Sequence, residues 1–289
     1  NTTASENTGI GKNALGANTT GAYNVAVGSG AFAANTSGAE GVAIGRNSLD
    51  ANTTGNNNVG VGIDSLGVNT TGGSNVAVGS YALDANTTSS DNVAVGHHSL
   101  GTNITGTQNT AIGKGSLFSN TTSNNTAAGF EALNANTTGT QNVAVGAGAL
   151  DANTTAANNT AVGYRAAYTQ EGASAQNTAV GMSALYTNNG GEYNTALGYY
   201  SMQGATTGDY NTAIGASTMV AANTGSYNNA VGYLALTANT SGAQNNAVGA
   251  GSLDANTTGS YNTAMGHDSL SANTTASNNT AFGHSALAL

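Results

Sequence analysis

The 289-residue chain contains no cysteine and only four lysine or arginine residues. Without cysteine no disulfide can stabilise it, and the sequence carries no indication of a redox compartment. Nucleic acids and anionic membranes bind clustered basic side chains, so a net charge of −9 argues against both as partners. The chain also lacks an apolar run of roughly 18 residues and a signal-like segment. We therefore expect no membrane insertion and no nucleic-acid binding.

The chain is instead dominated by a repeat. A five-residue signature, Asn-(Thr/Val)-Ala-(Val/Ile)-Gly with small variations, recurs seventeen times, in most cases at intervals of 17 residues. The copies begin at Asn7, Asn24, Gly41, Asn58, Asn75, Asn92, Asn109, Asn125, Asn142, Asn159, Asn177, Asn194, Asn211, Asn228, Asn245, Asn262 and Asn279. A fixed period of this length is typical of an array of small equivalent units. The sequence predicts one continuous array over residues 1–289, without capping domains.

The pattern within one unit predicts the fold. With the signature Asn as position 1, position 5 is always Gly and position 3 is nearly always Ala. Position 4 is mostly Val or Ile, and position 9 is mostly Leu. Position 12 opens an Asn-Thr-Thr-Gly segment that favours a turn. Gly, Asn and Thr interrupt the pattern too often for helices, whereas short runs between them suit strands. We predict an all-β fold, a parallel β-solenoid or β-roll of about 17 coils of 17 residues, with two short strands per coil.

Stacked coils would place identical residues above one another at roughly 4.8 Å. Asn at positions 1 and 12 would then form ladders, because each amide can bond to the copy above and below it. Strand residues alternate between faces, so positions 4 and 9 are expected in the core and the small position 3 outside, where a second chain could approach closely. This predicts a homo-oligomer whose interface contains Ala26, Ala43, Ala77, Ala94, Ala111, Ala144 and Ala161.

Two explanations remain open for the ends of the array. Asn1 falls at position 12 and Leu289 at position 11, so the repeat frame closes from one chain to the next. The segment is either a slice of a longer array or a unit that stacks head to tail into a filament.

The units beginning at Asn24 and Asn142, with the sequences Asn-Val-Ala-Val-Gly-Ser-Gly-Ala-Phe-Ala and Asn-Val-Ala-Val-Gly-Ala-Gly-Ala-Leu-Asp, carry a resemblance to a known family. They resemble the head repeats of trimeric autotransporter adhesins, and similar arrays occur in virus tail-fibre proteins. The resemblance covers essentially the whole chain, although the family's usual repeat is shorter and lacks the Asn-Thr-Thr-Gly segment. It implies a left-handed parallel β-roll, three chains to a trimer and a role in surface adhesion.

Candidates for chemistry are few. His267 and His284 occupy position 6 of adjacent copies, beside Asp268, and are the weak candidates for a metal site; no further ligand accompanies them. Paired carboxylates or a basic group in one groove, as glycan-cleaving solenoids require, are missing. We therefore predict no enzyme activity, no cofactor and no resident metal.

Tyrosines offer a candidate binding surface near the most irregular copy, which spans residues 159–176. Exposed tyrosines can contact sugars or proteins, so a host-surface glycan or protein is a candidate partner. The tyrosines concerned are Tyr164, Tyr168, Tyr186, Tyr193, Tyr199, Tyr200 and Tyr210.

The sequence thus predicts a structural, non-catalytic repeat protein. It would form a rigid extracellular, cell-surface or virion fibre or adhesin that associates laterally with itself, as a trimer or a filament. The alternative is a ligand-binding solenoid that takes glycan or ice, the latter through Thr columns at positions 13 and 14 such as Thr53 and Thr54.

Overall fold

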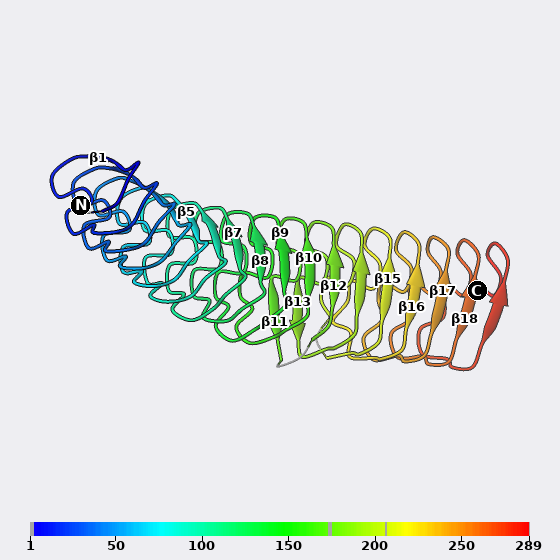
Figure 1. Ribbon diagram of the computed structural model, residues 1–289. Coiled ribbons are helices and arrows are strands. Elements are labelled where there is room, and N and C mark those ends of the chain that lie inside the picture. The colour runs from blue at the N-terminus through cyan, green and yellow to red at the C-terminus, as the bar shows by residue number, and fades with distance from the viewer. Residues whose placement is uncertain (1–2, 173–174, 206, 289) are drawn as a thin grey trace. The chain divides into compact units, whose positions relative to one another are not determined.

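The computed structural model describes residues 3–172, 175–205 and 207–288. The chain winds into stacked coils, and the part of each coil at positions 2–4 of the repeat is a three-residue strand (Figure 1). The chain divides into two compact units, Asn1–Asn142 and Val143–Leu289. The described residues contain strands and turns but no helix. The predicted all-β parallel solenoid with a period of about 17 residues is confirmed.

In the first unit, eight strands follow one another in a parallel sheet. Like positions pair with like, so that Val76 lies beside Val93 and Ala77 beside Ala94. The strands are β1 (Thr8–Ile10), β2 (Val25–Val27), β3 (Val42–Ile44), β4 (Val59–Val61), β5 (Val76–Val78), β6 (Val93–Val95), β7 (Thr110–Ile112) and β8 (Thr126–Ala128).

The second unit repeats the same arrangement. Its main parallel sheet keeps the same register, with Thr195 beside Thr212 and Ala196 beside Ala213. Its strands are β9 (Val143–Val145), β10 (Thr160–Val162), β12 (Thr178–Val180), β14 (Thr195–Leu197), β15 (Thr212–Ile214), β16 (Asn229–Val231), β17 (Asn246–Val248), β18 (Thr263–Met265) and β19 (Thr280–Phe282). A second, two-stranded parallel sheet pairs β11 (Thr169–Glu171) with β13 (Thr187–Asn189).

Among the described residues, a second regular strand is present only in the two coils that carry β11 and β13. Elsewhere the second half of the coil is a chain of turns. Position 9 adopts a left-handed backbone, as at Leu49 and Leu66 with φ of 52°. That conformation costs an L-residue about 1–2 kcal/mol. Full burial of the Leu side chain, worth about 1.5–3 kcal/mol, offsets the cost. Coil-to-coil bonding continues through the turns, since the Leu49 N–H donates to the Ser65 carbonyl at 3.0 Å.

The strands face the opposite way from the prediction. The seven alanines expected at an outer interface are fully buried inside their own coil, so the prediction that they face outward is wrong: Ala26, Ala43, Ala77, Ala94, Ala111, Ala144 and Ala161. Position 4 instead points outward, and Ile44 and Ile112 are 39% and 46% exposed.

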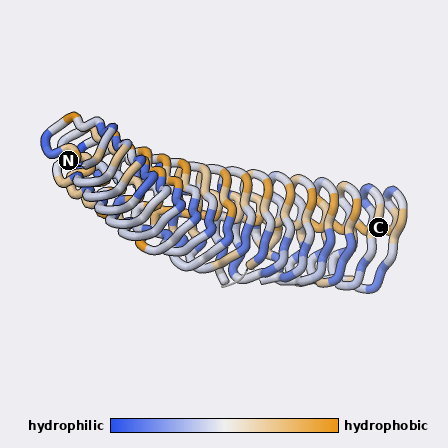
Figure 2. The backbone as a smooth tube through the Cα atoms, in the orientation of Figure 1, coloured by the Kyte–Doolittle hydropathy of each residue, from blue (hydrophilic) through white to orange (hydrophobic). Residues whose placement is uncertain are grey.

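Alanine at position 3 is explained by a thin interior. The buried Leu of position 9 packs from the opposite wall, and a Cβ built on Gly60, a position-3 residue, would lie 2.5 Å from Ser48 Oγ and 3.1 Å from Leu49 Cδ1. No larger side chain fits there. The small stripe therefore reflects packing within the coil, whereas the apolar residues of position 4 lie outside it. Figure 2 shows apolar residues recurring at the same place in successive coils of each unit.

Both asparagine ladders are present. At position 12, the Asn52 amide donates to Asn35 Oδ1 at 3.0 Å, and the Asn69 amide donates to Asn52 Oδ1 at 2.9 Å. At position 1 the side-chain oxygen instead accepts the backbone N–H of the next Asn, as between Asn75 and Asn58 at 3.0 Å. A buried amide that is bonded on both sides avoids the desolvation cost that an unpaired polar group would carry. A carboxylate could not donate, and its copies would repel one another.

Glycine at position 5 is required for two reasons, its backbone conformation and its contact with the next coil. Gly79 has a φ of 135°, in the region that side chains rarely adopt, and a Cβ there would lie 2.7 Å from the backbone of Gly96 in the next coil. The close approach of successive coils at this corner therefore requires the absence of a side chain.

Candidate functional site

One regular surface is the outer side of the strands, which we call the strand face: the residues at positions 2 and 4 of each copy. None of these residues is charged in any of the seventeen copies. Position 4 is apolar in every copy, and Leu197 is 43% exposed. In the first unit position 2 is mostly Val, and in the second it is mostly Thr, as at Thr195 and Thr212.

The strand face is unusual for a parallel sheet. Parallel sheets are generally covered on both faces. Here the inner side is covered by the coil's own Leu and Asn. The outer side is not covered by any described segment; it is uncharged throughout, apolar at position 4, and mostly apolar at position 2 in the first unit. Contiguous apolar surface without charge is typical of the centre of a protein interface. This surface was missed by the sequence analysis because the two sides of the strand were exchanged.

The tyrosines named from the sequence do not form one cluster. Tyr193 and Tyr210 occupy position 17, just before the strands, whereas the others occupy positions 6, 7 and 10, after the strands. Tyr199 and Tyr200 lie against each other, with ring centroids 4.0 Å apart and planes tilted by 39°. The structure therefore separates the predicted ligand surface into distinct groups.

One group forms what we call the Tyr ladder: Tyr193, Tyr210 and Tyr227. The ring centroids of Tyr193 and Tyr210 are 4.8 Å apart, those of Tyr210 and Tyr227 are 5.0 Å apart, and the planes are within 6° of parallel. Partial burial and the adjacent tyrosines raise the pKa of Tyr210, and the carboxylates of Asp209 and Glu192 add to this. Tyr227 was missed from the sequence, although aligning the copies by position 17 would have found it.

The second group surrounds Arg165, whose guanidinium lies 5.3 Å from the ring centroids of both Tyr164 and Tyr168. Tyr168 also stacks on Tyr186 at 5.2 Å. The carboxylate of Asp151 raises the pKa of the Tyr168 hydroxyl through its charge and a hydrogen bond. The cation and the carboxylate are thus already engaged with tyrosines of the chain itself.

The first unit has an aromatic cluster that the sequence analysis did not identify. The His98 ring stacks on Tyr81 at 5.0 Å, with planes 15° apart, and meets Phe118 edge-on at 5.8 Å. These residues come from positions 7 and 10 of adjacent copies. Nearby, burial raises the pKa of Asp84 most, and the charge of His98 acts against that shift.

The weak metal candidates do lie together. The rings of His267 and His284 stack at 5.2 Å and 6°. His267 Nδ1 is 2.9 Å from an Asp268 oxygen, and His284 Nδ1 is 3.0 Å from Ser285 Oγ. Because the two imidazole rings are parallel, the lone pairs of their ring nitrogens point in parallel planes and do not converge on one metal ion. Over the described residues, no group of three or more His, Cys, Asp or Glu side chains could hold a metal.

Three aspartates at position 10 have raised pKa values. Burial is the largest cause for Asp50, Asp84 and Asp254, because it disfavours the charged carboxylate. One oxygen of Asp84 and one of Asp254 are buried without a hydrogen-bond partner. These carboxylates therefore oppose folding when ionised.

The threonine column at position 13 serves the fold. Thr36 Oγ1 donates to the Thr53 carbonyl at 3.0 Å, and Thr53 Oγ1 donates to the Thr70 carbonyl at 3.0 Å. Each of these hydroxyls has given its only donor to the next coil and can bind water only as an acceptor. A Thr-based ice face at this position is therefore not supported.

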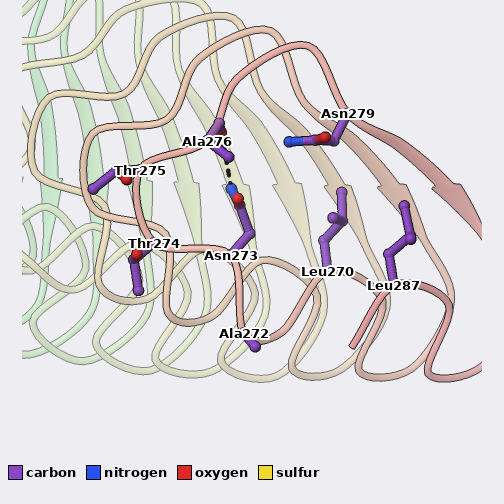
Figure 3. A pocket seen from close by; sticks show the side chains of 8 residues that line it. All are labelled: Leu270, Ala272, Asn273, Thr274, Thr275, Ala276, Asn279 and Leu287. Carbon is purple, nitrogen blue, oxygen red and sulfur yellow. Dashed lines mark hydrogen bonds between the residues drawn. The ribbon is translucent and has the colours of Figure 1, made fainter. Parts of the chain in front are cut away.

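A pocket lies at the last described coils (Figure 3). It opens over residues 272–276, on which no further described segment lies, whereas Leu270 is bonded to the next copy through its N–H and the Ala286 carbonyl at 2.9 Å. Its volume is about 290 Å³, and its wall consists of Leu270, Ala272, Asn273, Thr274, Thr275, Ala276, Asn279 and Leu287. The wall has the same Leu and Asn residues as every coil interior, so it is coil core rather than a separate ligand site.

No described part of the chain forms a helix suited to crossing a membrane. Comparison with known proteins supplies no family: no family model, no curated protein and no solved structure matches this chain.

Proposed function

We propose that the chain is a structural, non-catalytic solenoid of an extracellular, cell-surface or virion fibre or adhesin, in which copies associate laterally through the strand face. The observation that carries this proposal is the uncharged outer side of the parallel strands, with an apolar residue at position 4 of every copy. The partner chain would cover the side of the sheet that the coil itself leaves open.

The charge distribution supports this choice of surface. The few charged residues lie mainly at positions 6, 7, 10, 16 and 17, outside the strands, as at Lys114 and Asp64. Burying the strand face would therefore remove apolar groups from water without desolvating a charge, which is the favourable case for association. Rigid length comes from the repeated ladders.

Aspartates in two adjacent coils test the proposal. Val61→Asp with Val78→Asp places two charges on the strand face, and Thr71→Asp with Thr88→Asp places the same charges in the same coils at exposed position 14. We expect wild type and the Thr variant to sediment as oligomers and the Val variant as monomers. All three should keep the same circular dichroism, because none of the four side chains is in the coil interior.

A wild-type protein that is monomeric at every concentration would refute lateral association. An unchanged oligomer in the Val variant would remove the strand face as the interface.

A second candidate, ice binding, is favoured by one feature of the second unit. There Thr at position 2 lies two residues from an aliphatic position 4, as at Thr212 and Ile214, and the pairs repeat along a parallel sheet. The strand geometry places the two columns roughly 6.6 Å apart and the copies roughly 4.8 Å apart, a regular array of hydroxyls and methyls. Inhibition of ice recrystallisation would test this candidate. Loss of the inhibition in Thr195→Asp with Thr212→Asp, together with its retention in Thr71→Asp with Thr88→Asp at position 14, would support it.

A further inference from the structure

The Tyr ladder holds exposed phenols of consecutive coils face to face. Tyr193, Tyr210 and Tyr227 are 44%, 48% and 59% exposed. All three have a left-handed backbone, with φ of 57°, 54° and 61°. Because the same backbone geometry repeats from coil to coil, the rings are nearly parallel and are displaced by one coil spacing.

This arrangement is poorly suited to stacking on sugars. A pyranose ring packs on an open aromatic face, and the stack covers both faces of Tyr210 and one face each of Tyr193 and Tyr227. What remains open is the ring edges, which carry the hydroxyl group and the ortho carbons. The solvent therefore meets two pairs of phenols that are already in contact.

We propose that the Tyr ladder is a site of oxidative cross-linking, in which Tyr210 couples to Tyr193 or Tyr227 when a haem peroxidase and hydrogen peroxide act as the oxidant. Each phenol loses one electron and its hydroxyl proton to give a phenoxyl radical. Two radicals form one carbon–carbon bond between ortho positions, and the ortho hydrogens return to the oxygens as both rings become aromatic again. In sum, two tyrosines and one hydrogen peroxide give one dityrosine and two waters.

Proximity makes this coupling favourable. Two phenoxyl groups held one coil apart need only side-chain rotation to react, whereas phenols on separate chains must first meet by diffusion. The new bond would join neighbouring coils covalently. Since each coil of a solenoid contacts mainly its neighbours, such a link would oppose local separation of the coils.

The other tyrosine pairs are less suitable. The Tyr168 hydroxyl is engaged by Asp151, and the Arg165 guanidinium lies near its ring. Tyr199 and Tyr200 are adjacent in sequence, so a bond between them would not join two coils. Among the stacked tyrosines of the described residues, those of the Tyr ladder join neighbouring coils without a carboxylate hydrogen bond of the kind that engages Tyr168.

Treatment of dilute protein with peroxidase and hydrogen peroxide tests the inference. Cleavage after Met202 and Met219 places Tyr193, Tyr210 and Tyr227 on different peptides, and tandem mass spectrometry of the linked peptides from monomer-sized protein assigns the coupled residues. We expect links at Tyr193–Tyr210 and Tyr210–Tyr227 within one chain. Tyr210→Phe keeps the stacked ring but cannot couple, and should reduce these links by at least about tenfold.

Two further variants sharpen the result. Tyr261, also at position 17 but separated from Tyr227 by Gln244, is 60% exposed, and Tyr261→Phe should leave the ladder links unchanged. Gln244→Tyr would continue the column from Tyr227 to Tyr261 and should add new links there. The cross-linked wild type should also unfold at a higher temperature than cross-linked Tyr210→Phe.

Links found only between chains, or only at Tyr199–Tyr200, would overturn the inference. The inference would also be wrong if Tyr193 and Tyr227 formed as much dityrosine in Tyr210→Phe as in wild type, or if the wild type formed no dityrosine. Because the reaction is followed within one chain, these outcomes are independent of whether the strand face associates.

Discussion

The pair Phe32 and Gly41 departs from the repeat in two places at once. Phe32 replaces the usual Leu of position 9, and Gly41 replaces the usual Asn of position 1 in the next copy. A Cβ built on Gly41 would lie 2.5 Å from Phe32 Cζ and 3.0 Å from Cε2. The larger ring therefore occupies the space of the missing Asn side chain, and the Gly41 N–H still donates to Asn24 Oδ1 at 2.9 Å.

Restoring one member of the pair should destabilise the coil, and restoring both should not. Gly41→Asn forces a side chain into the fully packed ring of Phe32, an overpacking cost of about 1–3 kcal/mol. Phe32→Leu leaves unfilled volume beside Gly41, which we expect to cost about 1–2 kcal/mol. The double variant recreates the Leu and Asn of the other coils. It should be within about 1 kcal/mol of wild type, giving a favourable coupling energy of at least about 1 kcal/mol.

Amide hydrogen exchange in the coils around Phe32 is the appropriate assay, because a solenoid can open locally and a single global unfolding free energy can hide the change. Urea unfolding of the four proteins provides a second measurement. If Gly41→Asn leaves protection unchanged, or if the two substitutions are simply additive, the proposed exchange of volume between the two positions is wrong.

Three further substitutions test the interior. Ala77→Gln should destabilise the first unit by at least about 3 kcal/mol, since it places a large polar group in the thin core, and urea unfolding equal to wild type would contradict the inward assignment. Gly79→Ala combines an unfavourable φ with a contact 2.7 Å from the Gly96 backbone; we expect a loss of at least about 2 kcal/mol, and retained hydrogen-exchange protection would argue against that contact. The pKa of Asp254 is raised in the folded state, so its stabilising effect is present below the unfolded pKa and is lost as the pH rises through the folded pKa. Asp254→Asn should therefore stabilise the protein at pH 7, by less than about 1 kcal/mol because the carboxyl is partly solvated. It should also reduce the change in melting temperature between pH 7 and acidic pH. A variant with the same pH dependence as wild type would show that burial of this group is unimportant.

The repeat by itself determined the class of fold. A 17-residue period, an invariant Gly at position 5 and Asn at positions 1 and 12 left little choice except stacked coils, because ladders of identical residues are satisfied only when each copy lies on the next. The positions of the Asn ladders at Asn52 and Asn75 follow from the repeat alone. Local residue choice was sufficient here, since the contacts that define the fold repeat at one fixed separation along the chain.

Only the tertiary structure decided which side of each strand is inside. In a three-residue strand, alternation is equally satisfied by Ala77 inside with Val78 outside or by the reverse. Hydrophobicity favoured the reverse, but the space beside the buried Leu of position 9 admits only a methyl group. The sequence also did not show that Tyr193 and Tyr210 lie apart from Tyr199 and Tyr200. They are separate because positions before and after a strand lie at different corners of the coil. The volume across the coil, which no stretch of sequence encodes alone, thus determines where the exposed surface lies.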